Sequence, residues 1–167
     1  MSGEVESAPD DAPRPGVYVE TSVISYLTAE PSRDFRLRAH QQFTKEWWDL
    51  RRGEFRLFVS ALVRREAGAG DPAMVARRNE VLRLIEVVRI TDAAEELAAS
   101  LVRENLVPAK AAADALHIAT VAVYGIDYLL TWNCKHIANA RIRPRIENAC
   151  RRAGFKPPVL CTPEELL

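Results

Sequence analysis

Three acidic residues occupy positions from which carboxylates can do chemistry. Glu20 directly follows Val17-Tyr18-Val19, a run of β-formers that predicts a strand ending at this acid. Glu66 falls on the helix predicted just after a second strand. Asp114 falls inside an alanine-rich helix, where an aspartate is unfavourable and therefore requires an explanation. Open α/β sheets bind ligands at the carboxyl edge of their strands, so the three acids can meet there.

Each acid also has an ordinary explanation when it is considered alone. Glu20 can cap a turn before a helix, where the helix dipole favours a negative charge. Glu66 can be a solvated helical acid beside Arg64 and Arg65. Asp114 can form an ion pair with a lysine four residues earlier in the same helix. The chemical interpretation therefore depends on the three acids converging.

Converging carboxylates raise one another's pKa unless a cation neutralises them. Mg²⁺ or Mn²⁺ is the natural cation for such hard oxygen ligands. An ion of this kind activates water and stabilises the charge on a phosphodiester under attack. The positions of Glu20, Glu66 and Asp114 therefore favour metal-dependent cleavage of phosphodiester bonds.

Competing chemistries have little support in the sequence. The chain has no glycine-rich dinucleotide fingerprint, no phosphate-binding loop and no Gly-x-Ser-x-Gly motif. A small phosphatase on a similar sheet would need a nucleophilic aspartate at the end of the first strand and a second acid two residues later. Glu20-Thr21-Ser22 supplies neither.

The elements that position these acids alternate between strands and helices. Strands are predicted at residues 17–19, 55–60, 87–90, 127–131 and 159–160, with amphipathic or alanine-rich helices between them. A further helix is expected from about Cys134 to Ile142, interrupted by Pro144. This alternation predicts an α/β domain with a mainly parallel sheet that helices cover on both faces.

The long helix predicted between Arg33 and Arg52 is expected to pack on the sheet. Its apolar residues recur at near-helical spacing and define the face expected to be buried, whereas Trp48 lies off that face and is expected to be partly exposed. The residues of the predicted buried face are Phe35, Ala39, Phe43, Trp47 and Leu50.

Length and composition indicate one globular domain over residues 16–167, preceded by a flexible, polar leader over residues 1–15. The 23 basic and 23 acidic residues balance, so any nucleic-acid binding must come from local clustering. Three cysteines without a Cys-x-x-Cys pair argue against a disulfide framework or a zinc site. No apolar run approaches the roughly 20 residues that span a bilayer. A cytoplasmic protein without membrane association is therefore expected.

Four segments of the chain contain the three acids and the residues around them. They are Val-Tyr-Val-Glu-Thr-Ser-Val-Ile-Ser-Tyr-Leu at 17–27, Val-Ser-Ala-Leu-Val-Arg-Arg-Glu at 59–66, Ala-Asp-Ala-Leu-His-Ile-Ala-Thr-Val-Ala at 113–122, and Gly-Ile-Asp-Tyr-Leu-Leu-Thr-Trp-Asn at 125–133. Taken in this order, they resemble the PIN domain, and most closely the VapC-type toxin branch of prokaryotic toxin–antitoxin pairs. The resemblance implies a three-layer α/β/α sandwich and a Mg²⁺- or Mn²⁺-dependent endoribonuclease. It also implies an RNA substrate, a cognate antitoxin and a homodimer.

Site residues carry over from the family by matching position. Glu20 takes the place of the aspartate of the first strand, and Glu66 and Asp114 take the places of the second and third metal-binding acids. Asn133 takes a position that is often acidic and sometimes an amide, and Ser22 matches the small hydroxyl residue beside the first acid.

Two departures from the family pattern bear on activity. Glu20 is one methylene longer than the usual aspartate, so the metal geometry must adjust, and Asn133 removes a formal charge. Both departures favour an alternative function, in which the fold recognises RNA or a protein without cleaving it. Glutamate still binds Mg²⁺, and we therefore interpret the site as a variant that remains active.

Further residues are candidates for supporting roles. His117 lies on the same helical stripe as Asp114, where it can support the site or contact the scissile phosphate, or can be an ordinary hydrogen-bonded core histidine. Lys110, Arg64 and Arg65 are candidate RNA contacts, with surface ion pairs as the alternative.

Overall fold

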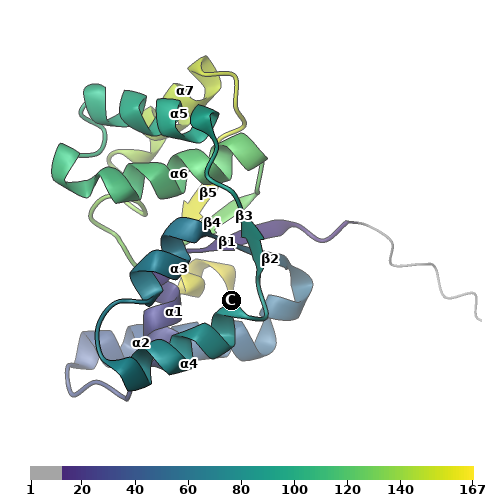
Figure 1. Cartoon of the computed structure of the whole chain (residues 1–167), viewed down its shortest axis with the longest axis vertical. Coiled ribbons are helices and arrows are strands. Elements are labelled where there is room, and N and C mark those ends of the chain that lie inside the picture. The colour runs from purple at the N-terminus through teal and green to yellow at the C-terminus, as the bar shows by residue number, and fades with distance from the viewer. Residues whose placement is uncertain (1–12) are drawn as a thin grey trace, which may run out of the picture.

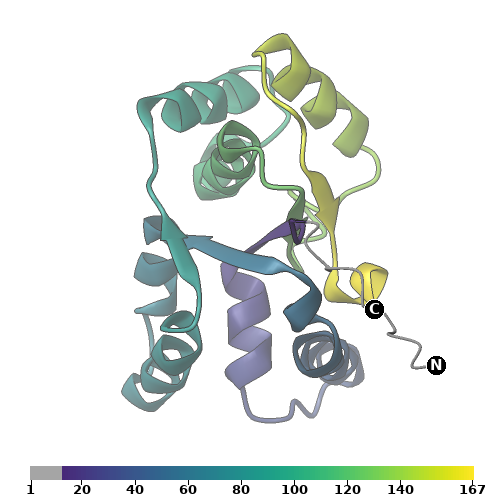
Figure 2. The same cartoon turned by 90° about the vertical axis from the view of Figure 1, so that its right-hand side faces the viewer.

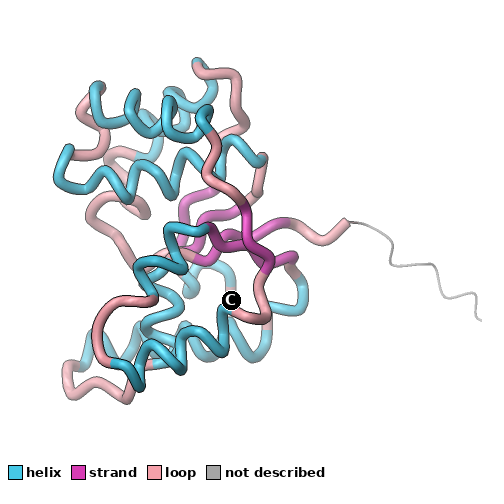
Figure 3. Tube along the Cα trace, in the orientation of Figure 1, coloured by secondary structure: helices cyan, strands magenta, loops and turns pink. Residues whose placement is uncertain are grey.

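The computed structural model describes residues 13–167, and in this part of the chain five strands form one sheet. The sheet has the order β3-β2-β1-β4-β5, and every neighbouring pair is parallel. Figure 3 shows the strands in magenta between two groups of helices. The strands are β1 (Gly16–Val19), β2 (Arg56–Ser60), β3 (Glu86–Val88), β4 (Tyr128–Leu130) and β5 (Val159–Cys161).

Helices cover both faces of this sheet and make the fold a three-layer α/β/α sandwich. In Figures 1 and 2 one face carries α1 (Thr21–Thr28), α2 (Phe35–Leu50), α3 (Ala61–Ala67) and α4 (Pro72–Leu82). The other face carries α5 (Asp92–Arg103), α6 (Ala112–Tyr124) and α7 (Arg143–Arg152). The described residues also contain three short 3₁₀ helices, which are η1 (Arg52–Glu54), η2 (Ala109–Ala111) and η3 (Pro163–Leu166). The α/β class and the parallel sheet predicted from the alternation are confirmed.

The central strand β1 is short, apolar and buried at every position, as expected for a parallel strand covered on both faces. Tyr18 aligns with Phe58 of β2, and Val19 aligns with Leu130 of β4. The ladder continues one step past β1, because the backbone N–H of Glu20 donates to the carbonyl of Leu130 at 3.0 Å. The carboxyl ends of β1, β2 and β4 therefore meet at one edge of the sheet.

The opposite edge is stabilised by Asp127, which lies just before β4. Its Oδ2 accepts a hydrogen bond from the backbone N–H of Gly16 at 2.8 Å, and its Oδ1 lies 2.9 Å from Nζ of Lys156. Asp127 thus joins the beginnings of β1 and β4 to the segment before β5. The hydrogen bond from Lys156 and the one from Gly16 hold the pKa of Asp127 below its usual value.

The predicted long helix is confirmed as α2. Its predicted buried face is right at Trp47 and partly right at Phe43, but it is wrong at both ends of the helix and at Trp48. Phe35 is 85% exposed and Leu50 is 72% exposed, whereas Trp48 is buried together with Trp47. The buried stripe also contains Gln41 and Thr44. These polar residues can be buried because they have partners: Nε2 of Gln41 donates to the carbonyl of Glu30 at 3.0 Å, and Oγ1 of Thr44 accepts from Nε1 of Trp132 at 2.7 Å.

The helix predicted from about Cys134 to Ile142 is replaced by a series of turns. The backbone N–H groups of Ile137 and Ala138 both donate to the carbonyl of Asn133, which closes a compact turn instead of starting a helix. Pro144 then lies in the first turn of α7, where proline is tolerated.

Two further sequence-based expectations concern the termini and membranes. Most of the expected leader, residues 1–12, lies outside the described residues, and Pro13 to Pro15 form neither helix nor strand. Within residues 13–167 no helix combines the length and apolarity required to cross a bilayer.

Candidate metal-binding site

Glu20 occupies the junction between β1 and α1, where it is only 6% exposed. Its Oε2 accepts hydrogen bonds from the backbone N–H of Ser22 at 3.1 Å, from Oγ of Ser22, and from Oγ1 of Thr131 at 2.7 Å. Within residues 13–167 no hydrogen bond is made to its other oxygen, Oε1. A buried carboxylate that is fixed through one oxygen and free at the other is prepared to bind a cation.

Ser22 connects the ends of two neighbouring strands. Its Oγ donates to Glu20 after β1 and accepts from the backbone N–H of Trp132, after β4, at 2.8 Å. Thr131 makes a parallel connection, since its Oγ1 donates to Glu20 and accepts from the backbone N–H of Asn133 at 2.9 Å. The two hydroxyl groups therefore orient Glu20 and fix the β4 end against it.

Glu66 approaches the same edge from the last turns of α3. Its Oε2 accepts a hydrogen bond from Oγ1 of Thr21, and Nε2 of His117 lies 3.2 Å from Oε2 and 3.4 Å from Oε1. Burial by itself would raise the pKa of Glu66. The hydrogen bonds and charge of His117, the hydroxyl of Thr21 and the charge of Arg65 outweigh it, and the pKa falls below its usual value. Glu66 is therefore a carboxylate at neutral pH.

His117 is 1% exposed and joins the site to the core. Its Nδ1 lies 2.7 Å from the phenol oxygen of Tyr18, which lies 2.7 Å from Oγ of Ser60. Burial raises the pKa of Tyr18 far above its usual range, so its hydroxyl keeps its proton. The result is a buried chain of hydrogen bonds that runs from Ser60 through Tyr18 and His117 to Glu66.

The structure brings together two of the three predicted acids and adds a histidine. One ligand atom from each of Glu20, Glu66 and His117 lies within 4.8 Å of the other two. Asp114 is not part of this group; it lies in the first turn of α6, half-buried, one turn before His117. The alternative of an ion pair between Lys110 and Asp114 is not seen among the salt bridges of residues 13–167.

Asn133 lies close in sequence to this group, but its side chain is occupied in a turn. Its Oδ1 accepts from the backbone N–H of His136 at 3.0 Å. Together with the two N–H groups bonded to its carbonyl, this contact makes Asn133 the organiser of the turn after β4. The amide thus has a clear structural role that a free site residue would not need.

The candidate RNA-contacting cations are all exposed. Arg64 and Arg65 lie on α3 directly before Glu66, and Lys110 lies on η2 just before α6. They flank the acidic group along the chain and are available to negatively charged ligands.

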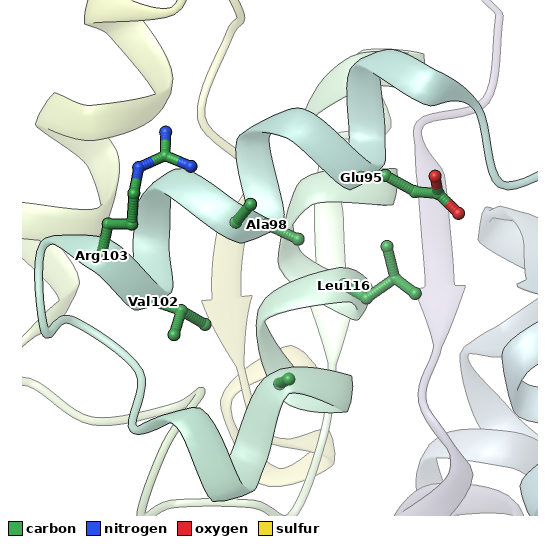
Figure 4. Close-up of a pocket in the computed structure, with 7 residues that line it drawn as sticks. Glu95, Ala98, Val102, Arg103 and Leu116 are labelled. Atoms are coloured by element: carbon green, nitrogen blue, oxygen red, sulfur yellow. The ribbon is translucent and has the colours of Figure 1, made fainter.

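A separate apolar groove lies between α5 and α6 and has a volume of about 470 Å³. Figure 4 shows Glu95 and Arg103 at its two ends, with Ala98, Val102 and Leu116 between them. None of the residues that line it belongs to the Glu20, Glu66 and His117 group. Its walls are mainly apolar, and the charged residues Glu95 and Arg103 lie at its ends, so it lacks a cluster of acidic ligands like that of Glu20 and Glu66.

Comparisons with known proteins agree with this architecture. The family model described as PIN domain matches residues 17–141, which include Glu20, Glu66, Asp114 and Asn133. Among curated proteins, no significant match is found. The fold is similar to the crystal structure of Mycobacterium tuberculosis VapC20, a sarcin-ricin loop cleaving toxin, with a TM-score of 0.55 and 23% identity. The match covers 72% of this chain and 92% of that one.

Proposed function

Because the chain belongs to the PIN-domain family, we propose that it is a Mg²⁺- or Mn²⁺-dependent endoribonuclease and the toxin of a toxin–antitoxin pair. The family match over residues 17–141 supports a nuclease. The similarity in fold to a toxin that cleaves the sarcin-ricin loop supports RNA as the substrate.

The observation that carries this proposal is the mutual approach of Glu20, Glu66 and His117 within 4.8 Å. Two carboxylates this close are stabilised by a cation, and the free Oε1 of Glu20 offers such an ion an unused ligand atom. Carboxylate oxygens suit Mg²⁺ and Mn²⁺ equally, and an imidazole suits Mn²⁺. The donor set therefore fits the metal that the family implies.

A divalent ion bound there would activate a water molecule and neutralise charge on the phosphodiester. The protein's own contribution is to hold Glu20 and Glu66 in place through the hydroxyls of Ser22, Thr131 and Thr21. Asp114, on the same helical stripe as His117, is assigned to the substrate side of the site. The exposed Arg64, Arg65 and Lys110 are assigned to contacts with RNA phosphates.

Cleavage of RNA by the purified, tag-free protein tests the proposal. Activity should require Mn²⁺ or Mg²⁺ and stop when EDTA is added. Glu66→Gln, which alters a proposed metal ligand, and Asp114→Asn, which alters the proposed substrate side, should each lower the rate at least roughly 100-fold, or about 2.7 kcal/mol of transition-state stabilisation. Glu80→Gln, at an exposed position of α4, is the matched control and should retain full activity. Full Mn²⁺-stimulated cleavage by Asp114→Asn would contradict the assignment of the site.

The alternative function is a binding module that recognises RNA or a protein without cleaving it. The engagement of the Asn133 side chain with His136 favours it, because this position then contributes no ligand. A metal titration separates the two functions. Saturable Mn²⁺ binding that depends on Glu20 and Glu66 supports the nuclease, and its absence supports the binding module.

The toxin role also implies a cognate antitoxin and a homodimer. A small antitoxin-like reading frame beside the gene would support the pairing. The mass of the purified protein in solution should be twice 18.7 kDa. A mass of 18.7 kDa at micromolar concentration would exclude the stable homodimer.

A further inference from the structure

The buried chain of hydrogen bonds behind the site lets His117 present a lone pair to a metal. Nδ1 of His117 lies 2.7 Å from the phenol oxygen of Tyr18, so one ring nitrogen is held inside the core. The other, Nε2, faces Glu66 at 3.2 Å from its Oε2, on the side of the ring where the group of Glu20, Glu66 and His117 is formed. The ring therefore points Nδ1 into the core and Nε2 toward the candidate metal site.

Two proton arrangements of a neutral His117 fit the contact with Tyr18, and they differ at Nε2. In the first, Tyr18 donates to Nδ1 and the protonated Nε2 donates to Glu66. In the second, Nδ1 carries the proton and donates to Tyr18, whose own hydroxyl donates to Ser60 at 2.7 Å. Only the second leaves the lone pair of Nε2 free. In it Tyr18 accepts from Nδ1 and Ser60 accepts from Tyr18, whereas Nε2 and the Glu66 carboxylate face each other without a proton. A cation bound by both groups would satisfy this last contact.

We propose that His117 binds the metal through Nε2, with Tyr18 as the positioning residue for its ring, and that this nitrogen ligand makes the site selective for Mn²⁺ over Mg²⁺. This inference rests on the metal site of the proposed function. Nε2 of His117 lies 3.2 Å from Oε2 of Glu66. Neighbouring ligands of an octahedral ion with bonds of roughly 2.1 Å lie about 3.0 Å apart, so the two atoms need little movement.

The chemistry of the ligand set determines the selectivity. Imidazole nitrogen binds first-row transition ions well, whereas Mg²⁺ prefers oxygen ligands and retained water. Histidine ligands also characteristically donate their second N–H to an oxygen, which is the role that the phenol of Tyr18 offers here. A site of acids alone would lack this preference.

Electron spin-echo spectroscopy of Mn²⁺ bound to the tag-free full chain tests the inference without measuring activity. The chain contains three histidines, so growth with ¹⁵N-histidine labels His117 and two others. Bound Mn²⁺ should show ¹⁴N modulation in the unlabelled protein and ¹⁵N coupling in the labelled one. This measurement on the wild-type chain needs no variant that might fail to fold.

Substitutions then show which histidine supplies the nitrogen ligand and whether that ligand causes the preference for Mn²⁺ over Mg²⁺. His117→Gln should lose the modulation and reduce the ratio of Mn²⁺ to Mg²⁺ affinity at least about 10-fold, whereas His136→Gln should change neither. Tyr18→Phe should keep the modulation but weaken Mn²⁺ binding about 10- to 100-fold, as expected for a positioning residue.

The outcomes distinguish this inference from the proposed function. Saturable Mn²⁺ binding without nitrogen modulation would overturn the role of His117 and leave the acidic metal site standing. Modulation that persists in His117→Gln would likewise overturn it. An absence of saturable Mn²⁺ binding in the wild-type chain would remove the metal site and this inference together.

Discussion

At the scale of single residues, Ser22 holds together groups from two strands that are far apart in the sequence. Its hydroxyl donates to Glu20 and accepts from the backbone N–H of Trp132. A change at this position therefore affects both the orientation of the carboxylate and the attachment of the β4 end.

Ser22→Ala should destabilise the fold by about 1–3 kcal/mol, because the backbone N–H of Trp132 loses its acceptor. It should also weaken Mn²⁺ binding about 10- to 100-fold, because Glu20 loses an orienting donor. Urea unfolding and a metal titration measure the two effects. Ser25→Ala on the same helix removes no side-chain hydrogen bond seen within residues 13–167 and should change neither. Equal effects of the two substitutions would refute the role of Ser22.

Asp127 lies at the edge of the sheet remote from the candidate site, and it makes the stability of the fold depend on pH. Its pKa is lowered in the folded state by the hydrogen bonds from Lys156 and Gly16, so the stabilisation is complete above the unfolded pKa of about 4. It is lost as the pH falls through the lower, folded pKa. Asp127→Asn should therefore be less stable than the wild type at pH 7, and the difference should shrink steadily below about pH 4. Urea unfolding at pH 7, 4 and 3 measures this; a difference that is constant with pH would count against it.

The positions of Glu20 and Glu66 could be predicted because strand ends and the following helices lead to one edge of a parallel sheet. His117 was predicted as a supporting residue, but its place among the ligand atoms in the position expected for Asp114 was not. The two residues share one helical stripe, and local spacing alone does not tell which of them approaches Glu20 and Glu66, because that depends on packing between residues distant in the sequence.

At the scale of elements, one hydrogen bond joins α2 to the segment after β4. Nε1 of Trp132 donates to Oγ1 of Thr44 in the buried interior, and Oγ1 of Thr44 donates to the carbonyl of His40. The ring of Trp132 also stacks on His40 with centroids 4.1 Å apart. This contact explains why α2 buries a threonine in place of the apolar residues that its sequence pattern favoured.

Thr44→Val should destabilise the fold by about 1–3 kcal/mol, because the indole N–H of Trp132 then lacks an acceptor in the interior. Thr44→Ser keeps the hydroxyl and should retain most of the stability. Thermal unfolding of both variants measures the difference. A valine variant as stable as the serine variant would show that the hydrogen bond contributes nothing.

The elements themselves could be predicted well. All five strands occur where the sequence placed them, with ends that differ by one or two residues. The buried face of α2 was mispredicted in part. Trp47 is buried as expected, but Gln41 and Thr44 are buried too because they find partners outside the helix, in the Glu30 carbonyl and Trp132. The turns after Asn133 were mispredicted as a helix because a single carbonyl accepts two N–H groups there.

At the scale of the whole molecule, the proposed metal site would link metal binding to folding. Glu20, Glu66 and His117 come from three separate segments, so the unfolded chain has no metal site. Mn²⁺ at 100 times its dissociation constant should stabilise the fold by about 2.7 kcal/mol, which raises the melting temperature by roughly 5–10 °C in a chain of this size. Differential scanning fluorimetry with and without Mn²⁺ measures the shift. Glu66→Gln should greatly reduce it, and an unchanged shift in that variant would place the ion elsewhere.

The strand order also determines when the site can first exist during synthesis. Glu20 is made early, but it is fixed by Leu130 and Thr131, which are translated 110 residues or more later. The strand that supports them on their far side, β5, follows at Val159–Cys161. A nascent chain therefore carries its first acid for most of its translation without a functional site around it. If the proposed ribonuclease activity holds, this order would keep the ribosome that makes the protein out of reach of that activity until β4 and β5 have been translated.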